Sequence, residues 1–390
     1  MLFHTFQCKK LILSLCVASL LCTQTITAFA QPTDTEASDT AAVDYDTDAA
    51  MRLEEPIDSN AIDGWPTGPV VGAEGAILLE ANTGTILYAK NIHEHLYPAS
   101  TTKILTTLVA IENSDLNDMV EFSNEAVFSI EQKSSNMGMD VGQSITMEQC
   151  LYGILVYSAN EVCNAVGEHI AGSISGFVDM MNAKAAELGC TDSHFVTTNG
   201  LHDENHYTSP YDLATIARAF FSNETLTRIA GTSHYTIEPT ATQPDLIDLY
   251  THNKLTNNTY PYEGYIGGKT GYTSQAHQTL VSCAERNGMK LICVVMKEDA
   301  PAQFTDTIAL FDYGFNNFSR VNVAQNETNY TGITLKDLKV KPNNLIACIV
   351  RKRQIIIPNG NDSIEAGDSV IVVTMEKHLE DLSDIIAQVQ

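Results

Sequence analysis

The chain has 390 residues, which is enough for two domains with buried cores. It contains 48 acidic and 22 basic residues, giving a formal net charge of −26 at pH 7. A surface this acidic repels phosphate backbones and anionic lipid headgroups, so we expect neither nucleic acid nor an anionic membrane as the substrate.

The first 30 residues have the order of a secretory signal peptide. Two lysines at positions 9 and 10 precede the apolar run LILSLCVASLLC, and the tripeptide AFA ends at Ala30. A charged start, an apolar run and a small-x-small end are the parts of a cleavable export signal. We therefore expect an exported, extracytoplasmic protein that is cleaved after Ala30. The alternative is an uncleaved membrane anchor, although the run is short for a bilayer span.

The next segment is acidic and poor in apolar residues. From 31 to 63 it consists mostly of Asp, Glu, Thr, Ala and Pro, and Arg52 is its only basic residue. Such a composition buries too little apolar area to fold by itself. We predict that residues 31–67 form an acidic disordered linker.

Residues 68–322 have the pattern of one α+β domain. Two short apolar runs flank the turn residues 82–84 and predict a β-hairpin. A helix is expected to begin at Pro98, because apolar residues then recur with the helical period. Thr146, with a glutamine three residues later, predicts the start of another helix in the block that follows. Strand-like runs then flank the Asn-Gly pair at 287–288, a strong hairpin signal. This order predicts helices packed against one antiparallel sheet.

The composition becomes polar around residues 321–332, which indicates a domain boundary. After it, the short apolar runs NNLIACIV, RQIIIP and DSVIVVT are separated by PNGND and EAGD. Short apolar runs between turn-forming residues are typical of β-strands. We predict a small β-rich domain over residues 330–390.

The cysteines outside the predicted signal peptide are widely scattered. They are Cys150, Cys163, Cys190, Cys283, Cys293 and Cys348. No CxxC motif or Cys/His cluster occurs, so we expect no metal site, and no motif indicates a cofactor. Cys283 and Cys293 lie on neighbouring predicted strands, where they either pair or pack as small buried hydrophobic residues.

A serine and a lysine lie three residues apart where the helix after Pro98 begins. Ser100 and Lys103 belong to the stretch YPASTTKILTTLVAIE. Side chains three apart on a helix share a face, so the hydroxyl and the amine are expected to meet. A lysine can take the serine proton only when burial or a nearby cation lowers its pKa. The alternative for this pair taken alone is an N-cap serine beside a solvated lysine.

Two further motifs follow in a consistent order. YSAN places Ser158 and Asn160 in a break between two predicted helices, and KTGYT places Lys269 and Thr270 on a predicted strand. Ser-x-x-Lys, Ser-x-Asn and Lys-Thr-Gly are the three elements of penicillin-interacting serine enzymes, in this order. The three matches together favour a catalytic function.

The segment from about residue 68 to 318 resembles the D-alanyl-D-alanine carboxypeptidases, the low-molecular-mass penicillin-binding proteins of peptidase family S11. Besides the three motifs, the resemblance rests on ANTGTILYAKN, PASTTK, TTNGLHDENHYTSPYDLATIA and GGKTGYT. It covers about two-thirds of the chain. It implies a transpeptidase/β-lactamase-like fold in which the three motifs converge on one cleft.

The resemblance also implies a catalytic role for each matching residue. Ser100 is expected to attack the carbonyl between the last two D-alanines and to become the acyl-enzyme. Lys103 is expected to take the serine proton, and Ser158 to pass a proton to the leaving amine. Asn160 is expected to orient Lys103 and the substrate amide.

The third motif is expected to bind the substrate. Lys269 and Thr270 would meet the terminal carboxylate, and Lys269 would help to keep Lys103 neutral by repulsion. Gly271 and Tyr272 complete the substrate-binding set, with the oxyanion held by the backbone N–H groups of Ser100 and Tyr272. The family often has histidine where this chain has Tyr272, and since the backbone acts there, activity is expected to survive.

These roles imply a carboxypeptidase that trims peptidoglycan stem peptides and binds β-lactam antibiotics covalently. A D,D-endopeptidase of the same family and a catalytically weak wall-binding protein remain alternatives. A class A β-lactamase would carry an E-x-x-L-N segment between the second and third motifs, and the sequence has none there.

The stretch from TLKDLKV to DSVIVVT resembles the TrkA C-terminal (RCK-C) domain, a small ligand-binding and dimerising module of potassium-transport regulators. The phrases LIACIVR, IIIPNG and EAGDSVIVV carry this resemblance. It implies a spacer or a dimerising role, and a homodimer through this domain is one expectation.

Overall fold

A computed structural model describes residues 45–322, 330–352, 354–374, 379 and 381–387. The predicted signal peptide, the cleavage position after Ala30 and the first part of the predicted linker lie outside these residues. Within the described ranges, no helix is both long enough and apolar enough to cross a membrane.

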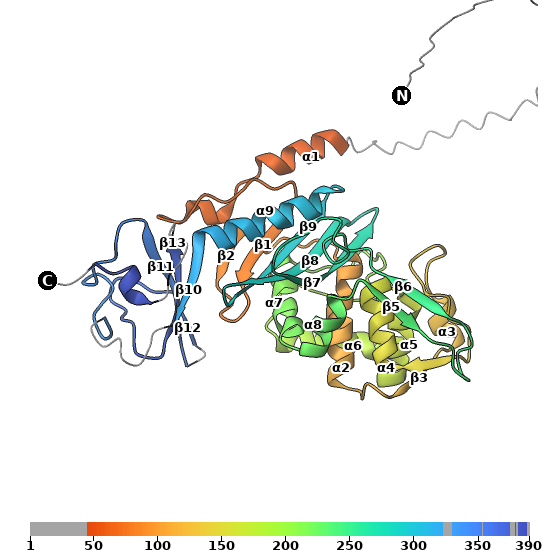
Figure 1. Ribbon diagram of the computed structural model, residues 1–390. Helices are drawn as coiled ribbons and strands as arrows, with labels where there is room; N and C mark the ends of the chain where they lie inside the picture. The colour runs from red at the N-terminus through yellow and green to blue at the C-terminus, as the bar shows by residue number, and fades with distance from the viewer. Residues whose placement is uncertain (1–44, 323–329, 353, 375–378, 380, 388–390) are drawn as a thin grey trace, which may run out of the picture. The chain divides into compact units, whose positions relative to one another are not determined.

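A five-stranded antiparallel sheet forms the centre of the larger domain (Figure 1). In sheet order its strands are β2 (Ile86–Lys90), β1 (Gly75–Glu80), β9 (Met289–Glu298), β8 (His277–Arg286) and β7 (Tyr265–Thr273). The hairpins predicted around residues 82–84 and 287–288 are both confirmed. Asn287 and Gly288 have φ values of 50° and 75°, as a tight two-residue turn between strands requires.

Helices cover both faces of this sheet. Helix α9 (Ala302–Asn317) lies along one face, and a helical block lies on the other (Figure 1). The block comprises α2 (Lys103–Glu112), α3 (Asn124–Phe128), α4 (Met147–Tyr152), α5 (Asn160–Ala171), α6 (Ile174–Glu187), α7 (Pro210–Phe221) and α8 (Glu224–Ala230). The predicted capping box is present, since the Thr146 side chain accepts from the backbone N–H of Gln149 at the start of α4. The α+β prediction is confirmed, with α9 on the face opposite helices α2 to α8.

Strand alternation separates two apolar cores. On β1, Ile77 and Leu79 belong to the core of the helical block, whereas Leu78 packs with Phe311 of α9. Successive side chains on a strand point to opposite faces, so fully buried strands carry apolar residues on both sides. The same alternation places Cys283 in the first core and Cys293 in the second. Both thiols are free and buried, as the alternative of small buried residues predicts.

Two small two-stranded sheets stand beside the helical block. They are formed by β3 (Met119–Glu121) with β4 (Ser144–Thr146), and by β5 (His234–Ile237) with β6 (Ile247–Tyr250).

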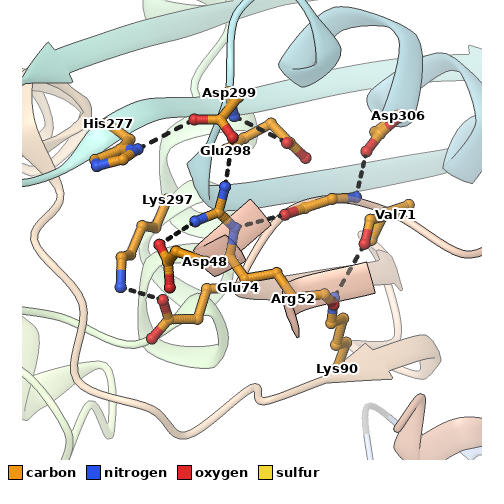
Figure 2. Close-up of polar contacts among 11 residues, drawn as sticks. Asp48, Arg52, Val71, Glu74, Lys90, His277, Lys297, Glu298, Asp299 and Asp306 are labelled. Carbon is orange, nitrogen blue, oxygen red and sulfur yellow. Dashed lines mark hydrogen bonds and ion pairs between the residues drawn. The ribbon is translucent and has the colours of Figure 1, made fainter. Parts of the chain in front are cut away.

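The prediction that residues 31–67 are a disordered linker is wrong for the described part of that segment. Helix α1 (Tyr45–Glu54) forms there and is held by Arg52, which is 2% exposed. Figure 2 shows the Arg52 guanidinium between Asp48 of its own helix and Asp299 at the end of β9. Its Nε also donates to Gly72 O at 3.0 Å, and Lys90 Nζ donates to Arg52 O. These partners are distant in sequence, so composition alone could not predict that the segment folds.

A second sheet contains the strands of the C-terminal part. Its order is β10 (Phe318–Asn322), β13 (Ser369–Thr374), β11 (Asn344–Arg351) and β12 (Gln354–Ile356). Strand β10 follows α9 directly and pairs with β13, although it falls inside the range 68–322 predicted for the larger domain. Cys348, Ile371 and Val373 of this sheet share an apolar cluster with Phe311 of α9. The exact domain bounds therefore stay a prediction.

Candidate active site

Ser100 and Lys103 meet at the start of α2. Ser100 lies in a short 3-10 turn, Ala99–Thr102, and Lys103 is the first residue of the α-helix. The sequence predicted Ser100 within the helix, but the tighter turn still brings the side chains together, because residues three apart nearly eclipse in a 3-10 turn. Lys103 Nζ lies 2.9 Å from Ser100 Oγ.

The Lys103 amine is buried among oxygen acceptors. It donates to Asn160 Oδ1 at 2.7 Å and to Asn199 O at 2.6 Å, and the residue is 0% exposed. Burial lowers its pKa to about 8. The amine is therefore partly neutral near physiological pH and can take a proton from the hydroxyl beside it.

Asn199 is a contact that the sequence analysis did not identify. It lies in the loop TTNGLHDENHY, which carried only the family resemblance. The buried ring of His206 fixes this loop, since its Nδ1 accepts from Val196 N at 3.0 Å and its Nε2 lies 2.9 Å from Thr102 Oγ1. Burial lowers the pKa of His206 to about 3, so the ring is neutral.

Gly200 explains why this loop can lie so close to the serine turn. It has φ of 82°, and a Cβ there would lie 1.9 Å from Ala99 O. Only a residue without a side chain fits this close approach.

Ser158 is held in a strained backbone conformation beside the same cluster. It follows a π-helical turn, Gly153–Tyr157, and has φ of 68°. A left-handed conformation at a residue other than glycine is uncommon and is frequent at functional sites. The residue is 5% exposed, and its Oγ accepts from Lys269 Nζ at 3.0 Å.

Lys269 on β7 points toward Ser158. Its Nζ also donates to Thr270 O at 2.8 Å, and the residue is 2% exposed. Burial and then the nearby Lys103 lower the pKa of Lys269 well below its usual value. One buried amine therefore contacts Ser100, and the other contacts Ser158.

Gly271 lets β7 pass against the serine turn. A Cβ at this position would lie 2.3 Å from Thr279 Oγ1, 2.9 Å from Pro98 O and 3.0 Å from Ser100 N. The next residue, Tyr272, is 63% exposed and lines the cleft.

A cleft of about 400 Å³ opens over the serine. Its lining consists of Ser100, Ser135, Ser158, His252, Lys254, Thr270, Gly271, Tyr272, Gln278, Ala300, Pro301, Gln303 and Phe304. No carboxylate belongs to this set, although the chain is strongly acidic. The electrostatics of the lining favour a substrate that carries negative charge.

The contacts gather all eight predicted site residues in one region. Lys103 contacts Ser100 and Asn160, and Lys269 contacts Ser158. Thr270, Gly271 and Tyr272 line the cleft. The family model described as D-alanyl-D-alanine carboxypeptidase, Peptidase S11, matches residues 65–300.

The chain belongs to the D-alanyl-D-alanine carboxypeptidase family. It is 34% identical over 253 residues to the D-alanyl-D-alanine carboxypeptidase DacF of Bacillus subtilis, a match spanning 63% of this chain and 63% of that protein. DacB2 of Mycobacterium tuberculosis is 34% identical over 258 residues, with 64% and 84% covered. The crystal structure of the Streptomyces K15 DD-transpeptidase superposes with a TM-score of 0.60 at 28% identity, covering 64% of this chain and 99% of that one. The expected DD-peptidase fold is confirmed.

A second family model, the TrkA-C domain, matches residues 320–387. This confirms the predicted resemblance of the C-terminal part. The match begins within β10, in agreement with the pairing of that strand in the second sheet.

Several cleft residues of this D-alanyl-D-alanine carboxypeptidase family member were not identified from the sequence. They include Lys254, Gln278 and Gln303. Each lies outside the three motifs, and no spacing rule connects them. Among the described residues, no group of three or more His, Cys, Asp and Glu side chains is arranged to hold a metal ion.

Proposed function

We propose that this chain is a serine-type D-alanyl-D-alanine carboxypeptidase that removes the terminal D-alanine from peptidoglycan stem peptides. The observation that carries the proposal is the buried Lys103 amine, 2.9 Å from Ser100 Oγ and held by Asn160. Family membership supports the same substrate class. The match spans less than two-thirds of the Bacillus subtilis relative. The activity is therefore proposed from the residues of this chain and is not transferred from that protein.

In the acylation step, Ser100 Oγ attacks the carbonyl carbon of the last peptide bond and Lys103 takes the hydroxyl proton. The backbone N–H groups of Ser100 and Tyr272 would stabilise the oxyanion. The C–N bond then breaks, and the leaving amine receives a proton through Ser158. D-alanine departs, and an ester to Ser100 remains.

In the second step a water molecule attacks this ester. The same groups act in reverse. The water proton leaves along the Ser158 route that protonated the leaving amine, and Ser100 Oγ recovers its proton from Lys103 as the ester C–O bond breaks. The shortened stem peptide leaves with a new carboxylate. The contact of Ser158 Oγ with Lys269 Nζ supports a proton route that includes both side chains.

β-Lactams would enter the same cleft and acylate Ser100. The absence of an E-x-x-L-N segment between the second and third motifs supports slow deacylation. An enzyme with this substrate acts outside the cytoplasm, in agreement with the export signal predicted from the sequence.

The test is mass spectrometry of the mature chain incubated with a pentapeptide stem and, separately, with penicillin. We expect the loss of one alanine from the peptide and a long-lived adduct on Ser100, with both absent in Ser100→Ala. Cleavage of a cross-linked stem dimer with no trimming of the pentapeptide would indicate a D,D-endopeptidase instead. An unaltered pentapeptide and an unlabelled protein would refute the proposal.

We also propose, separately, that the C-terminal domain makes the protein a homodimer. The proposal extends the resemblance of residues 320–387 to the TrkA-C domain, a dimerising module. Light scattering on the full mature chain tests it, and a monomer at micromolar concentration would refute it.

A further inference from the structure

A terminal carboxylate needs a cationic partner in the cleft, and Lys269 is poorly placed to be that partner. Its Nζ is occupied by Ser158 Oγ and Thr270 O, and only 2% of the residue is exposed. It does not belong to the residues that line the cleft. Lys103 is likewise buried and bonded to Ser100, Asn160 and Asn199.

Lys254 is the lysine that does line the cleft, together with Ser100 and Thr270. It is exposed, and within the described residues its side chain has neither an ion pair nor a hydrogen bond. Its Nζ lies 5.9 Å from the centroid of the Phe304 ring, which is also part of the lining. A cation over an aromatic face is held weakly, so it remains available to an anionic ligand.

The backbone on both sides of Lys254 is firmly anchored. Asn253 is 2% exposed, and its side chain donates to Tyr265 OH at 2.8 Å and accepts from Leu255 N at 3.0 Å. Leu255 is 1% exposed. Because the neighbours are fixed in the interior, the Lys254 side chain extends from a defined point at the cleft rather than from a free loop.

The wall near Phe304 also has an unused polar group. Gln303 is 4% exposed and its Nε2 donates to Gln278 Oε1 at 3.0 Å, while its Oε1 has no partner in the described structure. Gln278 and Gln303 both line the cleft. A buried amide with unused hydrogen-bonding capacity favours a polar ligand at this wall.

We infer that Lys254, rather than Lys269, is the counter-ion of the substrate's terminal carboxylate, with Thr270 as its neutral partner. The inference rests on the proposed function, because it concerns the same substrate. It assigns substrate recognition to a residue outside the three motifs. Lys269 keeps its contact with Ser158 and belongs to the proton route.

The test compares two stem pentapeptides, one with a free terminal carboxylate and one with a C-terminal amide. Lys254→Met should lower kcat/KM for the free acid about tenfold, the size expected for one partly solvated charge-assisted contact, mainly through KM. It should leave kcat/KM for the amide within about twofold of wild type. Lys254→Arg should retain most of the activity on the acid.

Lys290→Met is the matched control, because Lys290 pairs with Glu285 and lies outside the cleft lining. It should leave kcat/KM unchanged for both the acid and the amide. Raising the ionic strength should reduce the preference for the acid in wild type but not in Lys254→Met. Equal losses on acid and amide, or no loss on the acid, would overturn the inference.

The rates at which penicillin and its methyl ester label the protein give a second test that does not require turnover. If wild type labels with penicillin without releasing D-alanine, the proposed carboxypeptidase activity fails, but Lys254→Met should still slow labelling by the acid selectively. If wild type neither labels nor releases D-alanine, both proposals fail. Lys254 is exposed, so its replacement should not unfold the chain.

Discussion

Replacing Arg52 by methionine should destabilise the folded chain, because this residue attaches helix α1 to the larger domain. Its side chain is 3% exposed and contacts Asp299, which belongs to the segment between β9 and α9. Arg52 also donates to Gly72 O at 3.0 Å. Methionine keeps much of the apolar stem but removes every one of these donors.

The magnitude follows from how deeply each partner is buried. Removing one member of a buried ion pair costs about 3–5 kcal/mol, because the other charge is left uncompensated. Asp299 is 47% exposed and Asp48 28% exposed, so water recovers part of this loss. We therefore expect a decrease of about 2–3 kcal/mol in the free energy of unfolding, or roughly 5 °C in Tm.

Differential scanning calorimetry on the mature chain at pH 7 measures this change. Lys184→Met is the control, because its ion pairs with Glu112 and Glu187 lie at the surface and should contribute less than about 1 kcal/mol. If Arg52→Met and Lys184→Met shift Tm equally, or if Arg52→Met shifts it by less than about 1 °C, the reasoning about α1 is wrong.

Further predictions concern the Lys103 amine, a buried acid and the glycine of the third motif. Lys103→Ala should lower the penicillin acylation rate by orders of magnitude. In wild type the rate should rise with pH, reach half of its maximum near pH 8 and level off above it, because the amine loses its proton through that range. Stopped-flow labelling from pH 6 to 10 checks this, and a flat profile would contradict it. Burial, with Asp306 beside it, raises the pKa of Glu298 to about 8. The stability that this protonated carboxyl contributes is fully present below its ordinary pKa of 4.5 and is lost as pH rises through 8. Glu298→Gln should flatten the decline of Tm over that range, and an unchanged pH dependence would count against this assignment. Gly271→Ala should slow penicillin labelling at least about tenfold, because its Cβ would push β7 away from the Ser100 turn; labelling at the wild-type rate would show that the turn yields without loss.

The sequence alone was sufficient to predict the fold class and the contact between Ser100 and Lys103. The Ser-x-x-Lys motif depends only on spacing along one turn, so Ser100 and Lys103 meet whenever that turn forms. The Asn-Gly pair at 287–288 likewise specifies its hairpin locally, because both positions require positive φ. Such features depend on residues close together in the chain.

Other features were decided only by the tertiary structure. Arg52 lies in a segment whose composition predicts disorder, yet it is buried because Gly72 and Asp299 supply acceptors from far along the chain. Asn199 reaches Lys103 only because Gly200 lets two loops approach closely. Lys254 gains significance only from the cleft that it lines. In each case the deciding partner is distant in sequence, and only packing places the two within contact distance.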